Sequence, residues 1–450
     1  MKYKKHRDLI VNGSLYKVIL KISIPLMISE LIQRAYTLTD MYFMGRMGSV
    51  QVAALAFVDP VINAVMAAGM GLSVPMLSMV SQNIGSKNYE GARRSIGNLV
   101  FLASVLSILI GLTGTFASHP ILRALNVTGT LLQEGASYLR IVLLGTFFTF
   151  MNVCYLSVKQ AEGDTMKPLY MNIASLVFNL LLNPLFIFKM NMGITGAAVA
   201  TVISKGFLAA YGIYDLFYTG RGLKISREHL KISKEDLVKV MALGIPAVIT
   251  KSTSPIGNML INSHAVGYGA AVIAAVGLGN KVNSILFSLS TSLCASMSTI
   301  AGQNIGAGNL QRVREAVRKM GVITILLGII GSAVIIGFSD PILAVFTTDP
   351  AVVELTREFF IATTPTAVAW GIYQIVMGVH QGAGYTKISM YITVIRLWLM
   401  RIPLVFILDR FIGARSLWYS TAVATNAIGV VAVIFYLSGI WEKKNKYITA

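Results

Sequence analysis

The sequence predicts an all-α integral membrane protein, in which twelve transmembrane helices form two six-helix lobes related by a pseudo-twofold axis along the membrane normal. Composition, the length of the apolar runs and an internal repeat support this fold class. The 450 residues are 55% hydrophobic and only 13% charged, with a mean hydropathy of +0.69, whereas soluble domains are about a quarter charged. The apolar runs of about 20 to 28 residues suit helices that cross a hydrocarbon core of roughly 30 Å, and they are too long for barrel strands.

Each apolar run is interpreted as one membrane crossing. The first run follows the basic start MKYKKHRD, but it is too long for a signal peptide and no small-residue cleavage site follows it, so we interpret it as a retained helix. The predicted spans are 15–43, 51–80, 92–117, 134–159, 166–188, 193–219, 236–265, 272–301, 316–338, 357–382, 386–408 and 414–440.

The charge of the loops predicts the orientation of the spans. An even number of spans places both termini on one side, and that side also holds most of the Lys and Arg residues outside the spans. The positive-inside rule therefore predicts a multi-pass protein of the plasma (prokaryotic inner) membrane with cytoplasmic N- and C-termini. Topology and anionic lipid head groups account for the net charge of +19, so no nucleic-acid partner is implied. Cys154 and Cys294 fall inside spans and suggest no disulfide framework.

An internal repeat divides the chain into two halves. SQNIGSKNYEGARRSIGNL begins at Ser81, and the similar GQNIGAGNLQRVREAVRKM begins at Gly302. The same offset aligns SIP (23–25) with GIP (244–246), AA (53–54) with AA (274–275), and QAEGDT (160–165) with QGAGYT (381–386). Six spans per half give both halves the same orientation. We predict an N-terminal lobe at 1–218, a cytoplasmic linker at 219–240 and a C-terminal lobe at 241–450.

Two six-helix lobes that face each other across a cleft are the usual architecture of a secondary transporter. The sequence contains no G-x-x-x-x-G-K-[ST] loop for ATP, and no G-x-x-x-D-R-x-G-R-R-like stretch of the major-facilitator type follows the second span. The five histidines are scattered and none belongs to H-E-x-x-H. We therefore predict a transporter that is not an enzyme, with no metal site and no cofactor apart from a coupling ion.

Polar side chains form helical stripes in three spans of the first half. At about 100° per residue, these stripes comprise Ser29, Gln33, Tyr36 and Asp40 in the first span, Asn172, Ser175, Asn179 and Asn183 in the fifth, and Thr201, Ser204 and Lys205 in the sixth. Such stripes face protein or a water-filled cavity, because exposure to hydrocarbon is expensive. They predict a polar pocket in the N-terminal lobe; the alternative is that the Asn, Ser and Thr groups only join helices by hydrogen bonds.

Asp40 is the candidate coupling residue. A carboxylate costs roughly 2.5–3.5 kcal/mol at the centre of a span, which favours a functional role over a structural ion pair. Among hydrogen-bonding neighbours it can gain and lose a proton. The equivalent residue of the second half is Ile261, so coupling is predicted in the N-terminal lobe.

Several further residues are candidates for substrate binding. Asp59 aligns with Asn280, next to Lys281, on the opposite wall of the predicted cleft. We hypothesise that Asp59 contributes to substrate binding and approaches Lys281 in one state; a fixed bridge or a snorkelled lysine is an open alternative. Lys205, Lys251, Arg396 and Arg401 have no assigned role beyond pairing at helix ends or inside a lobe.

Methionines and aromatic residues extend this set. The first two spans are rich in Met, including Met66, which suits promiscuous binding but equally suits ordinary packing. Gln33 lies on the polar stripe of the first span. Tyr36 and Tyr373 could stack on a flat cation.

The paired QNIG segments, the SIP and GIP entries, the TD-x-x-F-x-G pattern at Thr39 to Gly45 and the 6+6 repeat together resemble the multidrug and toxic compound extrusion (MATE) family. The similarity covers about residues 15 to 440. It implies a transporter that opens alternately to each side and exports organic cations or other amphiphiles in exchange for H⁺ or Na⁺. The expected partners are a small amphiphilic or cationic substrate and membrane lipid, and the expected state is a monomer.

The resemblance also implies where the coupling ion binds. In the archaeal and DinF-like branch of the family, the positions that match Asp40, Asn179, Asn183 and Thr201 form the cation site, and Tyr36 lies on the same stripe. An acid is expected where this chain has Asn183, so Na⁺ binding becomes less certain and exchange of one proton at Asp40 more plausible. The NorM-like branch places acids in the seventh and tenth spans, where this chain has none.

Two other functions stay open at this point. A lipid-linked saccharide or lipid flippase of the same superfamily usually has fourteen spans and a more cationic cavity. A membrane-bound lipid transferase is the less favoured alternative, and it would form product without an ion gradient.

Overall fold

The computed structural model describes residues 2–125, 127–219 and 222–443. These residues form helices and connecting turns, and no β-strand occurs among them. The helical segments are α1 (Lys2–Asn12), α2 (Leu15–Gly45), α3 (Ser49–Gly85), α4 (Tyr89–Ala124), α5 (Gly129–Leu144), α6 (Thr146–Ala161), α7 (Met166–Pro184), η1 (Leu185–Lys189), α8 (Gly193–Tyr214), η2 (Asp215–Thr219), η3 (Arg227–Leu230), α9 (Lys234–Ala265), η4 (Val266–Tyr268), α10 (Ala270–Gly306), α11 (Leu310–Gly337), α12 (Ser339–Ala344), α13 (Pro350–Thr363), η5 (Thr364–Thr366), α14 (Ala367–Gly382), α15 (Thr386–Val394), η6 (Ile395–Arg401), α16 (Ile402–Ile412), η7 (Gly413–Arg415), α17 (Ser416–Leu437) and η8 (Ile440–Glu442).

The helices account for all twelve predicted spans. Within the described residues nine stretches are long and apolar enough to cross a membrane, and the bent pair α5 and α6 makes ten. The 31 residues of α2 are also long enough, although five charged side chains lower its hydropathy. The 52-residue stretch Thr386–Leu437 provides two crossings, because the chain turns at Gly413, where φ is 56°, and α17 packs back on α16. The predicted all-α membrane fold is confirmed.

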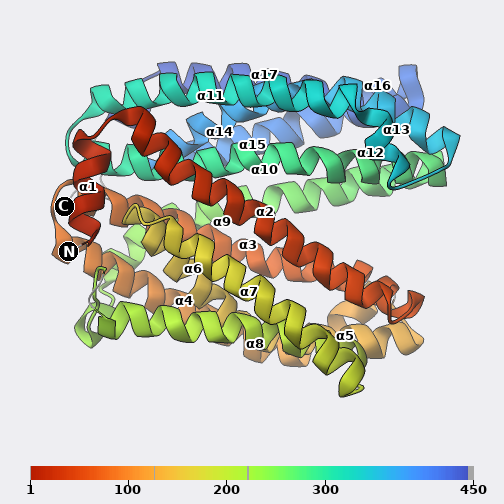
Figure 1. Cartoon of the computed structure of the whole chain (residues 1–450), viewed down its shortest axis with the longest axis horizontal. Helices are drawn as coiled ribbons and strands as arrows, with labels where there is room; N and C mark the ends of the chain where they lie inside the picture. The colour runs from red at the N-terminus through yellow and green to blue at the C-terminus, as the bar shows by residue number, and fades with distance from the viewer. Residues whose placement is uncertain (1, 126, 220–221, 444–450) are drawn as a thin grey trace.

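The first long helix of each half packs against the other half. Figure 1 shows both termini at one end and α2 running obliquely between the two halves. The first part of α2, including Leu15 and Leu26, shares a core with Leu293 of α10, and its later part packs on α7. Conversely, Val240 and Leu243 of α9 join the core of α3, α4 and α6. The exact boundaries 1–218, 219–240 and 241–450 stay a prediction.

The two QNIG segments end in the same turn. Lys87 and Gly308, which are equivalent in the repeat, both adopt the left-handed backbone region, with φ of 63° and 76°. The next residue in each copy is an asparagine that caps the following helix: the Asn88 side chain accepts from the Gly91 N–H at 2.9 Å, and Asn309 accepts from the Arg312 N–H at 3.3 Å. The repeat in the sequence is therefore also a repeat of local structure.

The QNIG segments bring the halves into contact at the end that carries the termini. Gln82 Nε2 donates to the Gly382 carbonyl at 2.7 Å, and Gln303 Nε2 donates to the Ala161 carbonyl at 2.7 Å. A Cβ atom at Gly85 would clash with the Gln303 backbone, and one at Gly306 would clash with the Gln82 backbone. Only glycine allows the two helices to approach this closely. We call the contacts of Gln82, Gln303, Gly85 and Gly306 the seal.

A buried ion cluster fixes the connector to the first half. Lys159 lies 3.1 Å from Glu162 and 2.9 Å from Asp215, which also lies 3.0 Å from Lys167. Glu162 accepts the backbone N–H of Leu223 at 2.6 Å. The described part of the connector therefore packs against the first half, because its first residues supply a donor to this cluster.

Candidate functional site

The predicted polar stripes of the first and fifth spans meet. The helices α2 and α7 pack side by side, and Asn179 Nδ2 donates to both the Tyr36 hydroxyl and Asp40 Oδ1 at 3.0 Å. Asn183 Nδ2 donates to Asp40 Oδ1 at 2.9 Å and to Asn179 Oδ1 at 3.0 Å. Both asparagines are 0% exposed. We call Tyr36, Asp40, Asn179 and Asn183 the carboxylate network.

The carboxylate network has free acceptor atoms. Among the described residues, donors reach Oδ1 of Asp40 but none reaches Oδ2. Asn183 Oδ1 is buried without a hydrogen-bond partner in the same part of the chain, and Thr201 lies beside the Tyr36 hydroxyl. Buried oxygens are normally hydrogen-bonded. A proton, a water molecule or a small cation at this position would satisfy them.

Charged neighbours set the electrostatics of the network. Lys205 of α8 and Asp59 of α3 both lie within electrostatic range of Asp40. Asp59 is exposed, and it is in no ion pair of the described residues. The N-terminal half therefore places two carboxylates and one ammonium group around a single polar region.

The structure places the predicted substrate residues at separate positions. Gln33 Nε2 donates to Asn172 Oδ1 at 2.9 Å, so this pair joins α2 to α7, the same two helices that form the carboxylate network. Met66 packs against the core of the first half. Lys281 is exposed on α10 and forms no ion pair with Asp59 in this conformation of the described chain. Tyr373 is buried and shares a hydrogen bond of 3.0 Å with Thr393.

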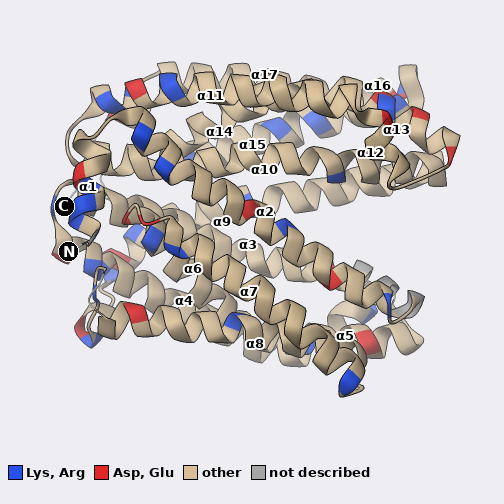
Figure 2. Cartoon of the chain, viewed as in Figure 1, with Lys and Arg blue, Asp and Glu red and all other residues tan. Residues whose placement is uncertain are grey.

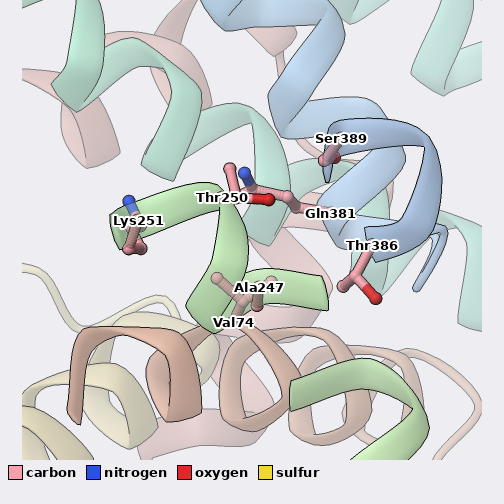
Figure 3. Close-up of a pocket in the computed structure, with 7 residues that line it drawn as sticks. All are labelled: Val74, Ala247, Thr250, Lys251, Gln381, Thr386 and Ser389. Atoms are coloured by element: carbon pink, nitrogen blue, oxygen red, sulfur yellow. The ribbon is translucent and has the colours of Figure 1, made fainter. Parts of the chain in front are cut away.

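Tyr373 contributes to a cavity of about 350 Å³ between the halves. The polar and aromatic lining includes Glu30, Lys251, Trp370, Tyr373, Gln374 and Arg396. A narrow recess adjoins it, and Figure 3 shows Thr250 of α9 beside Gln381 of α14, with Thr386 and Ser389 of α15 on the far side of Gln381 and Lys251 on the opposite side of Thr250. The carboxylate network does not line this cavity, so the molecule holds two distinct polar regions.

The two halves carry the same family signature. The model of the MatE family matches residues 25–185 and 246–407, and the starts of the two matches are equivalent positions of the repeat. The chain belongs to the MATE family of multidrug efflux transporters. It is a membrane-spanning transporter, and its family consists of transporters and not of enzymes.

Known MATE proteins resemble the chain over nearly its whole length. It is 26% identical over 433 residues to the probable multidrug resistance protein YoeA of Bacillus subtilis, covering 94% of this chain and 93% of that protein. It is 23% identical over 450 residues to the probable multidrug resistance protein NorM of Thermotoga maritima, covering 95% and 93%. The crystal structure of MATE in complex with MaL6 superposes with a TM-score of 0.92 at 22% identity, covering 96% and 98%, which confirms the two-lobed fold.

Some residues of the two polar regions were not assigned from the sequence. Lys251 and Arg396 had no role beyond helix-end or internal pairing, yet both line the cavity. Arg396 lies in η6, a π-helical segment, so α-helical periodicity does not predict which way it faces. The repeat gave one indication that Lys251 faces the other half. Lys251 stands at the position equivalent to Glu30, and the two lie within electrostatic range.

Proposed function

We propose that this MATE transporter is a secondary active antiporter, which exports organic cations or amphiphilic drugs in exchange for H⁺ and exposes its site alternately to each side. Asp40 is the exchanging carboxylate. The observation that supports this assignment is the carboxylate network: a membrane-embedded acid held by two asparagine amides, with Oδ2 left free for a proton.

Exchange at Asp40 links the proton to the substrate through charge. The ionised carboxylate of Asp40 attracts a cation that binds near Asp59. The protonated form of Asp40 has no net charge to hold this cation. Entry of a proton therefore weakens cation binding and favours release. One charge moved through 100 mV supplies about 2.3 kcal/mol, which sustains a modest gradient of drug.

The choice of H⁺ over Na⁺ follows from the number of carboxylates. Asn183 contributes an amide where the DinF-like branch of the family has an acid, so the network holds one carboxylate fewer. We assign the chain to that branch on the position of Asp40, with Tyr36, Asn179, Asn183 and Thr201 shaping the site. Na⁺ is the alternative coupling ion.

We also propose that the protein works as a monomer in the plasma membrane with both termini in the cytoplasm. Figure 2 shows many blue segments gathered at the end that carries both termini, which supports this orientation under the positive-inside rule. The seal then closes the cytoplasmic side. A flippase of the wider superfamily is the less favoured alternative, since it would usually have fourteen spans.

The test is uptake of a dye cation into inside-out vesicles under separately imposed pH and Na⁺ gradients. The wild-type protein is expected to accumulate dye when a pH gradient is applied, and Asp40→Asn is expected to lose this response. Asp409→Asn is the matched control, since Asp409 lies on α16 near His264 and away from the carboxylate network. Uptake that stays coupled to the pH gradient in Asp40→Asn would overturn the assignment.

A further inference from the structure

The cavity between the halves has a wall made of cations and aromatic rings, formed by Lys251, Trp370, Tyr373 and Arg396. The Arg396 guanidinium lies 5.0 Å from the centre of the Trp370 ring, whose centre is 5.1 Å from that of Tyr373. All four side chains line the cavity. We call them the cationic wall.

The protein neutralises the charges of the cationic wall only in part. Arg396 is only 7% exposed, and neither Arg396 nor Lys251 forms an ion pair among the described residues. Glu30 is the acid that lines the cavity, and it lies within electrostatic range of Arg34 as well as Lys251. Two cations therefore face the cavity against one shared carboxylate, and a buried charge without a counter-ion is expensive.

The wall also has donors without acceptors. Arg396 donates to Ser254 Oγ at 3.3 Å through Nη2, but its Nε is buried and unpartnered within the described chain. The Trp370 Nε1 donor is unpartnered in the same way. Both atoms are donors, so they require an acceptor, and a guanidinium is suited to bind carboxylate or phosphate oxygens.

We infer that the cationic wall binds a planar aromatic anion, with a phosphate or carboxylate group at Arg396 and Lys251 and the ring against Trp370 and Tyr373. A flat cation is disfavoured here because Arg396 already occupies the face of Trp370. The carboxylate network, in the other half, has the opposite charge. The two halves of one transporter thus offer sites of opposite polarity, so its substrates are not restricted to cations.

This inference is independent of coupling through Asp40, because it concerns equilibrium binding without a gradient. The purified full chain in nanodiscs is titrated with flavin mononucleotide and with riboflavin, which has the same ring and no phosphate, and binding is followed by flavin fluorescence anisotropy. We expect flavin mononucleotide to bind at least tenfold more tightly than riboflavin. Equal affinities would overturn the inference.

Variants of the wall residues test whether the preference for flavin mononucleotide over riboflavin arises at the cationic wall. Arg396→Gln and Lys251→Gln are each expected to weaken the binding of flavin mononucleotide at least fivefold. Each variant should keep an affinity for riboflavin within twofold of the wild-type value. Arg396→Lys keeps the charge and is expected to retain most of the preference, which separates loss of charge from misfolding. Arg410→Gln is the matched control, since Arg410 is exposed on α16 and lies outside the cavity. An unchanged preference in Arg396→Gln would refute the site.

Competition identifies the anionic group. 1-Naphthyl phosphate and 1-naphthoate are compared with neutral 1-naphthol as displacers of bound flavin mononucleotide. Stronger displacement by the phosphate than by the naphthoate identifies a phosphate site, and the reverse order identifies a carboxylate site. If neither anion displaced better than 1-naphthol, the wall would not be an anion site.

Discussion

Gln82 and Gln303 make the same hydrogen bond in opposite directions across the boundary between the two halves. Each Nε2 lies 2.7 Å from a carbonyl oxygen of the other half, that of Gly382 for Gln82 and that of Ala161 for Gln303. The two donors are equivalent positions of the repeat, and so are the two acceptors. Because both bonds join the halves, they stabilise the conformation in which this end is closed.

Loss of either glutamine is expected to open the seal. Gln303→Ala leaves the buried Ala161 carbonyl without its side-chain donor, which costs about 1–3 kcal/mol. Gln82→Ala leaves the Gly382 carbonyl with only the longer hydrogen bond of 3.3 Å from Ser78 Oγ. We expect the population open at this end to rise about tenfold in either variant and further in the double variant. The measurement is the distance between spin labels at Arg94 and Arg318, which are exposed on the two halves. Ser86→Ala, at an exposed position beside the seal, should leave that distance unchanged.

Alanine substitutions at the glycines of the seal test its role by steric hindrance. In Gly85→Ala the new methyl group meets the Gln303 backbone, and in Gly306→Ala it meets that of Gln82. Backbone cannot move aside as a flexible side chain can, so both variants are expected to keep this end open and to lose transport. Gly321→Ala is the control, because a Cβ there has no neighbour within 4 Å. Full transport by Gly85→Ala would contradict this role of the seal.

Asn183→Asp is expected to create sodium dependence. A second carboxylate beside Asp40 adds negative charge and an oxygen ligand where Asn183 Nδ2 now donates at 2.9 Å. A ligand that binds only the folded state raises its stability, so the unfolding temperature of the variant should rise in NaCl relative to choline chloride. Asn172→Asp, on the same helix but bonded to Gln33, should show no such rise. Equal responses of the two variants would argue against a specific site.

Asp215→Asn is expected to destabilise the fold strongly. Asp215 is 2% exposed, and Lys159 lies 2.9 Å from it, so the substitution leaves a buried ammonium group short of one partner. Breaking a buried pair costs about 3–5 kcal/mol. Glu90→Gln instead removes an exposed carboxylate that contacts Arg93 at 3.3 Å and His229 at 2.8 Å, and it should cost less than about 1 kcal/mol. The free energies of unfolding of the two variants are compared in detergent by circular dichroism. Similar losses of stability in both variants would contradict a structural role for the buried Asp215.

Helical periodicity predicted much of the carboxylate network. Asp40 and Tyr36 share a face of one helix, as do Asn179 and Asn183, and the contact of α2 with α7 brings the two faces together. The repeat likewise predicted two equivalent halves. It did not reveal that the QNIG segments bond to each other's half, because an aligned pattern gives no contact partner.

The cationic wall could not be predicted in the same way. Arg396 lies in a π-helical segment, in which side chains do not follow the 100° spacing on which the prediction rested. The ion cluster of Lys159, Glu162 and Asp215 was missed for another reason. Lys159 and Glu162 are only three residues apart, but Asp215 comes from a distant segment, so its contact with Lys159 depends on tertiary packing.

The reciprocity of the seal has a consequence for the origin of the chain. One half supplies one glutamine, one carbonyl and one glycine, so two identical copies of a six-helix precursor would have satisfied both bonds as a homodimer. The carboxylate network and the cationic wall each occur in only one half. Two such copies joined in one chain need not stay alike, so the symmetric closure is compatible with a carboxylate site in one half and a cationic site in the other.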